Sequence, residues 1–217
     1  MKRREFSLAA ATVAAATAFA LPNAAHAQGK PPKDGDDYLS LDKRVPVEAP
    51  AGKVEVIEFF WYSCPHCNAF EPKLVEWIKH LPKDVAIKRV PVGFRDDFVP
   101  QQRLFYVLEA MNKLDELHGK VFYAIHVEHQ PVNTQDTIAA WVEKQGVDKA
   151  KFLELYNSFS ITTKTARARQ LQDLYKVQGV PALGIAGRFY TDGSLAQNME
   201  RALQVTDYLV AEVRKGK

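Results

Sequence analysis

The spacing of apolar residues changes several times along the chain. Between residues 38 and 92 it predicts strands. Residues 54–60, VEVIEFF, form a short apolar run rich in β-branched and aromatic side chains, which is typical of a buried strand. Residues 85–92 alternate well enough to predict a second core strand. A short edge strand is expected at residues 38–41. Three strands are therefore predicted before residue 97.

Helical spacing dominates the middle of the chain. Apolar residues recur on one helical face between residues 65 and 81. From about residue 99 to residue 175 the pattern is helical throughout and contains no convincing strand. Thr134 and Asp148 are suited to cap two of the helices in this block, and its last helix is predicted near residues 161–177.

Strand signals return after Gly179. Residues 182–185 and 188–190 flank Ala186-Gly187, which predicts a tight hairpin. Residues 194–197, SLAQ, resemble a capping box and are expected to open the last helix.

This order of elements predicts an α/β protein, a thioredoxin fold with an inserted all-helical domain. We expect residues 28–97 to form the first part of the thioredoxin domain and residues 98–177 to form the helical insertion. Residues 178–217 then complete the thioredoxin domain.

The first 27 residues have the pattern of a secretory signal peptide. A basic start, KRR, precedes an apolar stretch near residues 8–21, and Ala25-His26-Ala27 has the small-x-small pattern of a cleavage site. We expect cleavage before Gln28 and export to the periplasm. A membrane anchor is the alternative, but the apolar stretch is shorter than the roughly 20 residues that a spanning helix needs. Residues 3–6, RREF, also suit a twin-arginine signal, so the export route stays open.

Charge argues against a nucleic-acid partner. The whole chain has a net charge of +3. Residues 1–27 contribute three basic groups and one acidic group, which leaves about +1 for the remainder. A near-neutral chain lacks the basic surface that nucleic-acid binding requires. An exported chain, by contrast, meets an oxidising compartment in which cysteines can cycle through a disulfide.

Cys64-Pro65-His66-Cys67 is the most informative motif, and it contains both cysteines of the 217-residue chain. A C-x-x-C at a strand-to-helix junction is typical of thiol–disulfide redox chemistry. Cys64 would lie at the helix N-terminus, where amide groups and the dipole stabilise a thiolate, so we predict that it is the nucleophile. Cys67 would lie one turn further in, on the same face, as the resolving thiol.

The two residues between the cysteines fit this interpretation. Pro65 suits the first turn of a helix, because its missing N–H group would have no partner there. A cationic or hydrogen-bonding imidazole at His66 would stabilise the Cys64 thiolate further. Stabilising the reduced form makes the disulfide a stronger oxidant.

Half of a zinc site is the alternative interpretation of the cysteine pair. Zinc normally takes four ligands, and the chain has no second cysteine pair. His118, His126 and His129 are available, but histidines on a helical block are more often solvated or hydrogen-bonded. We therefore expect no metal and no bound cofactor.

Glu58 is an acidic residue in an otherwise apolar strand, six residues before Cys64. If buried, its carboxyl group would have a raised pKa and could exchange a proton with Cys67. A partly exposed edge glutamate is the equal alternative. Lys88 on the neighbouring strand is a candidate partner for it.

Val180-Pro181 lies between the helix end at Gly179 and the next strand. In a thioredoxin-like fold this position holds a cis proline that faces the redox pair. Backbone groups of Val180 would then bind an extended substrate peptide as an added strand. An ordinary trans proline at a strand start is the alternative. Four aromatic residues form a candidate rim around the cysteines: Trp61, Tyr62, Phe94 and Phe98. Any single one of them is better suited to the core, and Trp61 is the best rim candidate because it immediately precedes the loop.

Several of these segments together resemble the DsbA family of periplasmic thiol:disulfide interchange proteins. The resemblance rests on residues 58–60, EFF, on Cys64-Pro65-His66-Cys67 with the following Phe70-Glu71, and on residues 179–182, GVPA. It spans nearly the whole chain after the leader.

The resemblance implies a monomeric oxidase that donates its disulfide to reduced exported polypeptides. An inner-membrane, quinone-coupled partner, DsbB, would reoxidise it. Carried over by position, Cys64 is the nucleophile, Cys67 the resolving thiol and His66 the tuning residue. Pro181 is the cis proline, and Glu58 matches the buried acid.

Two other functions remain open at this stage. One is a disulfide isomerase or reductase of the same fold, although isomerases of this group are dimers with an added N-terminal domain. The few residues before Tyr38 are too short to build such a domain. The other is a periplasmic chaperone in which the disulfide is only structural.

Overall fold

The computed structural model describes residues 30–216, and the predicted leader lies outside them. The chain from Pro32 onward forms one compact unit. Its five-stranded sheet has the order β1-β5-β4-β2-β3, and only β2 and β3 run parallel. The strands are β1 (Leu39–Ser40), β2 (Val54–Phe60), β3 (Val85–Pro91), β4 (Ala182–Ile185) and β5 (Phe189–Asp192).

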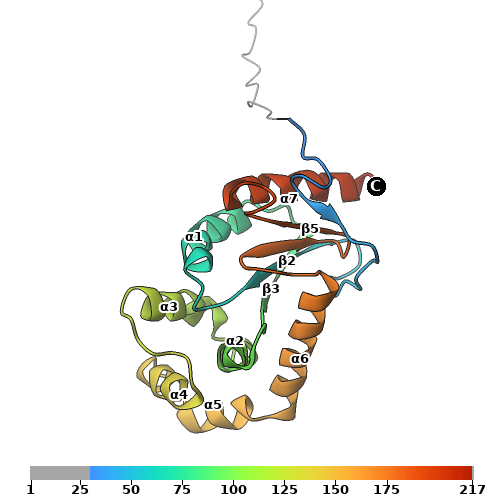
Figure 1. Cartoon of the computed structure of the whole chain (residues 1–217). Helices are drawn as coiled ribbons and strands as arrows, with labels where there is room; N and C mark the ends of the chain where they lie inside the picture. Colours follow the sequence, from blue (N-terminus) through green and yellow to red (C-terminus); the bar gives the residue numbers. More distant parts are fainter. Residues whose placement is uncertain (1–29, 217) are drawn as a thin grey trace, which may run out of the picture. The chain divides into compact units, whose positions relative to one another are not determined.

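Helices cover the sheet and fill the interval between β3 and β4 (Figure 1). Helices α1 and α7 pack on each other, and α7 contacts strands β2, β4 and β5. Helix α6 lies toward the other side of the sheet, beside α2. The helices are α1 (Pro65–Lys79), η1 (Asp96–Phe98), α2 (Val99–Ala110), α3 (Leu114–His126), α4 (Gln135–Lys144), α5 (Lys149–Tyr156), α6 (Phe159–Leu174) and α7 (Met199–Arg214).

Strand β2 is buried along its whole length, and its two faces belong to different cores. Val54 and Val56 join the cluster formed with α1 and α7. Ile57 and Phe59 join the larger cluster that includes the helical region, and the Phe59 ring lies 5.3 Å from that of Tyr175. Because side chains alternate across a strand, this one segment supports both layers of the molecule.

The predicted hairpin is confirmed. Residues 186–188 join β4 to β5, and the Arg188 N–H group donates to the Ile185 carbonyl oxygen at 2.9 Å. The two central residues of this turn, Ala186 and Gly187, have the positive φ angles that it requires, 54° and 66°. A Cβ atom on Gly187 would lie 2.0 Å from the carbonyl oxygen of Val45, so both the backbone angle and the close approach demand glycine.

Among the predicted helix starts, two are confirmed and one is wrong. Thr134 and Asp148 cap α4 and α5. The last helix, however, is capped by Asn198 and begins at Met199, not at the predicted box of residues 194–197. The carboxylate of Asp192 accepts hydrogen bonds from the amides of Ser194 and Leu195, which holds this segment in a turn instead.

The other predicted elements shift by only a few residues. The long helix expected at residues 161–177 spans Phe159–Leu174, and the edge strand is β1. Within residues 30–216 no helix combines the length and apolarity that are needed to cross a bilayer.

Candidate active site

The cysteine pair lies where β2 passes into α1. Cys64 is the N-cap of α1 and Pro65 occupies its first turn, as predicted. Cys64 Sγ accepts a hydrogen bond from the backbone N–H of Cys67 at 3.4 Å. Both cysteines are free thiols in this structure. Cys64 is 7% exposed and Cys67 is fully buried, so Cys64 presents the accessible sulfur.

The two thiols have opposite electrostatic environments. The pKa of Cys64 is lowered to about 6, first by the hydrogen bond from the Cys67 thiol and then by the backbone amides of Cys67 and His66. The charge of the exposed His66 is the weakest of these influences. Burial raises the pKa of Cys67 far above its usual range. The helix N-terminus and the partner cysteine thus stabilise the Cys64 thiolate more than the imidazole does.

The Val180–Pro181 peptide bond is cis, and it faces the cysteine pair. The Cys64 thiol donates a hydrogen bond to the Val180 carbonyl oxygen at 3.3 Å. A hollow of about 440 Å³ lies beside this contact, between α1 and the β5–α7 loop. His66, Val180 and Pro181 line it together with Gly193. This opening gives an extended chain access to the backbone next to the reactive sulfur.

Glu58 is fully buried, which decides between the two alternatives left open by the sequence. Burial raises its pKa from 4.5 to about 8, and the charge of Arg89 opposes that rise. Arg89 Nη1 lies 3.2 Å from Glu58 Oε2. Lys88, the expected partner, binds Glu48 instead. The register pairs Glu58 with Arg89, so Lys88 lies on the opposite face of β3.

Arg89 also joins three residues that the sequence did not single out as a group. Its Nη2 donates to Glu71 Oε1 at 2.9 Å, and its Nη1 donates to the Nε2 atom of His118. The other ring nitrogen of His118 is then the donor to the Tyr62 hydroxyl, at 2.8 Å. Burial lowers the pKa of His118, so the ring is neutral near pH 7. Glu58 thus belongs to a buried polar cluster just behind the cysteine pair.

The histidines considered as zinc ligands are used in other ways. His118 lies in the buried cluster, and the Nε2–H group of His126 donates to the Tyr62 carbonyl oxygen at 2.8 Å. His129 occupies a left-handed backbone position in a loop, with φ of 53°. Within the described residues no three histidine, cysteine or acidic side chains gather in a way that would hold a metal ion.

The aromatic residues near the motif divide between rim and core. Tyr62 is fully buried, so it belongs to the core. Trp61 is half-buried and stacks on Phe98, with ring centroids 4.1 Å apart. Phe94 is exposed and meets Phe98 edge-on. Trp61, Phe98 and Phe94 therefore form an apolar ledge in which the segment before Cys64 packs against η1 and the loop that precedes η1.

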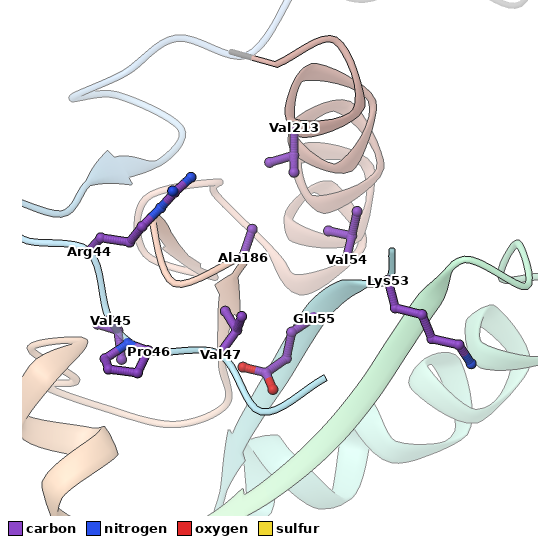
Figure 2. A pocket seen from close by; sticks show the side chains of 9 residues that line it. All are labelled: Arg44, Val45, Pro46, Val47, Lys53, Val54, Glu55, Ala186 and Val213. Carbon is purple, nitrogen blue, oxygen red and sulfur yellow. The ribbon is translucent and has the colours of Figure 1, made fainter. Parts of the chain in front are cut away.

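A second hollow, of about 520 Å³, lies at the opposite end of β2 (Figure 2). Val54 and Glu55 from the start of that strand line it, together with Arg44, Lys53 and Val213. Neither cysteine contributes to this hollow. This hollow is therefore separate from the cysteine pair, which lies at the other end of the strand.

Comparison with known proteins agrees with this geometry. A family model described as a DSBA-like thioredoxin domain matches residues 55–204. The thiol:disulfide interchange protein DsbA of Bordetella parapertussis is 42% identical over 209 residues, which cover 96% of each chain. DsbA of Pseudomonas aeruginosa is 41% identical over 180 residues, covering 83% of this chain and 85% of the relative. Its crystal structure matches with a TM-score of 0.80 over 84% of this chain and 94% of that chain, at 41% identity. The expected thioredoxin fold with a helical insertion is thereby confirmed.

Proposed function

This chain belongs to the DsbA family of thiol:disulfide oxidoreductases, and on that basis we propose that it is an oxidase that donates the Cys64–Cys67 disulfide to reduced exported polypeptides. The observation that carries the proposal is the contrast between the two sulfurs. The accessible sulfur has a pKa lowered to about 6, whereas the buried one is strongly disfavoured as a thiolate. A stabilised thiolate in the reduced form makes the corresponding disulfide oxidising.

The exchange proceeds in two steps. A substrate thiolate attacks Cys64 Sγ, and the Cys64–Cys67 bond breaks as a substrate–Cys64 disulfide forms. The electron pair leaves with Cys67 Sγ, which takes up a proton. A second substrate thiolate then attacks the substrate sulfur and releases Cys64 as a thiolate. The substrate loses two electrons, the protein gains them, and Cys64 is a good leaving group because its pKa is low.

Glu58 supplies the proton for Cys67 in this proposal. With a pKa of about 8, the buried carboxyl group is mostly protonated at neutral pH. The charge of Glu58 is also among the influences that raise the pKa of Cys67, so the two groups interact. A protonated acid behind the leaving sulfur allows Cys67 to depart as a thiol.

Val180 and Pro181 form the substrate-binding backbone. While Cys64 is protonated, its thiol donates a hydrogen bond to the Val180 carbonyl oxygen. Once Cys64 is in a disulfide, that thiol proton is gone, and the carbonyl is able to accept a hydrogen bond from an extended substrate. His66, beside the same hollow, adds to the stabilisation of the thiolate that leaves.

We place this activity in the periplasm, after cleavage of the leader before Gln28. Reduced exported polypeptides are the substrates, and a DsbB-like inner-membrane enzyme linked to quinone restores the disulfide. The protein acts as a monomer, without a bound cofactor or metal and without a nucleic-acid partner. The single redox pair and the near-neutral charge of the mature chain support this assignment.

Equilibration with glutathione tests the proposal. Purified protein lacking residues 1–27 is incubated in buffers of graded redox poise, and the thiols are trapped and counted. We expect Cys64 and Cys67 to remain reduced even in strongly oxidising buffer, and the oxidised protein to oxidise a reduced dithiol peptide stoichiometrically. A disulfide that persists until the buffer is strongly reducing would identify a reductase-like or structural pair and overturn the oxidase assignment.

A further inference from the structure

The Tyr62–Ser63 peptide unit, one residue before Cys64, is held at both of its polar ends by side chains of the helical region. Its carbonyl oxygen belongs to Tyr62 and accepts the hydrogen bond from His126 Nε2 at 2.8 Å. Its N–H group belongs to Ser63 and donates to Gln101 Oε1 at 3.2 Å. The two side chains come from different helices, α3 and α2.

Gln101 is only 2% exposed and makes three hydrogen bonds in this place. In addition to accepting from the Ser63 amide, its Nε2 atom donates to the Ser63 hydroxyl oxygen at 2.7 Å and to the Val132 carbonyl oxygen at 2.7 Å. Val132 is buried in the loop between α3 and α4. One amide side chain therefore ties that loop to the segment before the reactive cysteine.

His126 lies in the last turn of α3, and its ring stacks on that of Phe122 at 6.2 Å between centroids. This packing directs one ring nitrogen toward the Tyr62 carbonyl group. Neither His126 nor Gln101 makes a hydrogen bond to either cysteine, so any effect on the sulfurs must pass through the backbone that they hold.

From this geometry we propose that Gln101 and His126 are positioning residues, which fix the Tyr62–Ser63 peptide unit and thereby aim the Cys64 sulfur at the amides of the α1 N-terminus. The proposal rests on the proposed function, because it concerns the sulfur that performs the exchange. Cys64 is an N-cap residue with φ of −81° and ψ of 117°, and its own N–H group donates to the Trp61 carbonyl oxygen at 3.1 Å. The backbone of residues 61–63 therefore determines how the Cys64 side chain meets the first turn.

Loss of this support would let the Cys64 side chain move away from the amides of His66 and Cys67, which now stabilise its thiolate. The thiolate would then be less favoured in the reduced protein, and the disulfide would be a weaker oxidant. The helical region thus contributes to the redox equilibrium without touching a sulfur atom.

The chain offers a matched control in the next residue of the same helix. Gln102 is also fully buried, but its Nε2 atom donates to the Pro91 carbonyl oxygen at the end of β3. Gln101→Met and Gln102→Met therefore remove the same group at adjacent positions, and only the first affects the segment before Cys64. For the histidine, His126→Phe retains an aromatic ring without the donor, whereas His126→Gln retains a donor.

The experiment measures the Cys64 pKa from the pH dependence of thiolate absorbance, the glutathione equilibrium, and urea unfolding for each variant. We expect Gln101→Met and His126→Phe to raise the Cys64 pKa by about one unit. The equilibrium should shift about tenfold toward the oxidised protein, which is about 30 mV. Gln102→Met should lower the free energy of unfolding about as much as Gln101→Met does, but it should leave the Cys64 pKa unchanged. His126→Gln should keep the Cys64 pKa closer to that of the unmodified protein than His126→Phe does.

The proposal is overturned if Gln101→Met and Gln102→Met have the same Cys64 pKa and the same glutathione equilibrium. Failure of the proposed function gives a different result, because the unmodified protein itself would then be unable to oxidise the dithiol peptide. A milder substitution, Ser63→Ala, removes only the bond from Gln101 Nε2 to the Ser63 hydroxyl group. It should give a smaller shift in the same direction, and a shift in the opposite direction would also contradict the proposal.

Discussion

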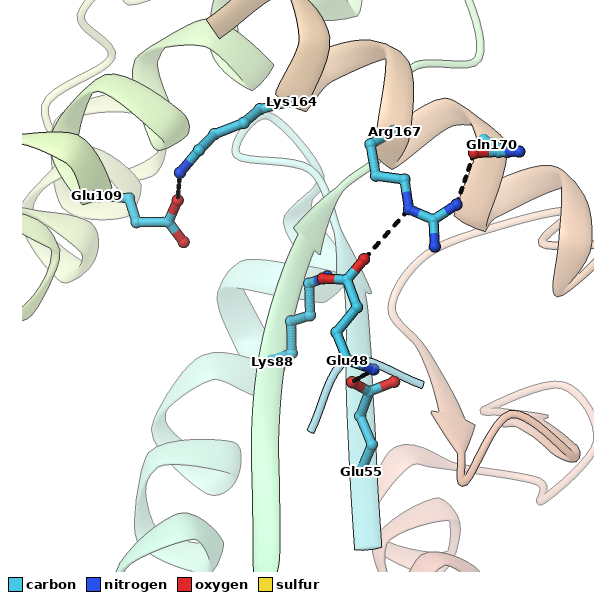
Figure 3. Close-up of polar contacts among 7 residues, drawn as sticks. All are labelled: Glu48, Glu55, Lys88, Glu109, Lys164, Arg167 and Gln170. Atoms are coloured by element: carbon cyan, nitrogen blue, oxygen red, sulfur yellow. Dashed lines mark hydrogen bonds and ion pairs between the residues drawn. The ribbon is translucent and has the colours of Figure 1, made fainter. Parts of the chain in front are cut away.

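The two ends of β2 each bury a glutamate, and they hold it in opposite ways. Glu55, at the end away from the cysteines, is 4% exposed and accepts a hydrogen bond from the backbone N–H of Glu48 at 2.8 Å (Figure 3). Glu58, toward the redox end, is fully buried. Within the described chain neither of its oxygens has a hydrogen-bond partner, and its nearest cation is Arg89, at 3.2 Å.

The surroundings explain the contrast. Glu48, next to Glu55, belongs to a half-exposed network in which it binds Lys88 of β3 and Arg167 of α6 (Figure 3). Water screens such charges, so their ion pairs contribute little to stability. Burial raises the pKa of Glu58, and the charge of Glu71, which shares the same Arg89 cation, adds to that rise. The same residue type in the same strand is thus structural at one end and, in the proposed mechanism, a proton donor at the other.

The largest effect should follow from removing the buried cation. Arg89→Met leaves Glu58 and Glu71 close together without their shared partner, and we expect the free energy of unfolding to fall by about 3–5 kcal/mol. Urea unfolding measures it, and an unchanged m-value would show that compactness is retained. A loss below about 1 kcal/mol would mean that the two ends of the strand are electrostatically alike.

The pH dependence of stability should distinguish the redox end in a second way. The pKa of Glu58 is about 8 in the folded protein and near 4.5 when exposed, so the unfolded state releases this proton first as pH rises. The stability that the protonated carboxyl confers is complete below about pH 4.5 and is lost as pH rises through about 8. Across that window, the free energy of unfolding of Glu58→Gln should therefore rise relative to that of the unmodified protein, by up to about 1.4 kcal/mol per pH unit.

Urea titrations of both proteins from pH 5 to pH 9 provide this measurement. Glu71, whose pKa is lowered, is present in both proteins, so its titration largely cancels in the difference. If the difference in the free energy of unfolding between the two proteins stays constant with pH, Glu58 is ionised in the native state. Its assignment as proton donor to Cys67 would then fail.

The sequence predicted the local parts of both ends well. Residues 54–60 were predicted as a strand and are β2, because a short apolar run between turn signals has few other structures available. The cysteine spacing predicted a helix N-terminus because the motif lies within one turn. The start of α7 was mispredicted because the competing partner, Asp192, binds the amides of that segment across a turn.

The polar clusters were not predictable in the same way. Pairing Glu58 with Arg89 and not with Lys88 requires the register of β3 against β2, which apolar alternation alone does not determine. Gln101 and His126 lie 38 and 64 positions from their backbone partners. Nothing in the local pattern marks a buried glutamine as a partner of the redox loop, so only the tertiary structure reveals it.

The smallest effect is expected at the far end of β2. Glu48→Gln weakens the ion pairs with Lys88 and Arg167 but keeps the bond to Glu55, because a backbone amide donates that bond. We expect a loss of at most about 1 kcal/mol that disappears in high salt. Lys88 holds the pKa of Glu48 below its usual 4.5, so the contribution is present above that value and is lost as pH falls through the lowered pKa.

A double-mutant cycle of Glu48→Gln with Lys88→Met isolates this pair by urea unfolding at low and high salt. Lys88 adjoins Arg89 in β3 but faces the other side of the sheet, so the cycle is the direct counterpart of the Arg89→Met experiment. A coupling energy above about 2 kcal/mol would place this pair with the buried ones. The distinction between a screened end and a buried, chemically active end of β2 would then have to be abandoned.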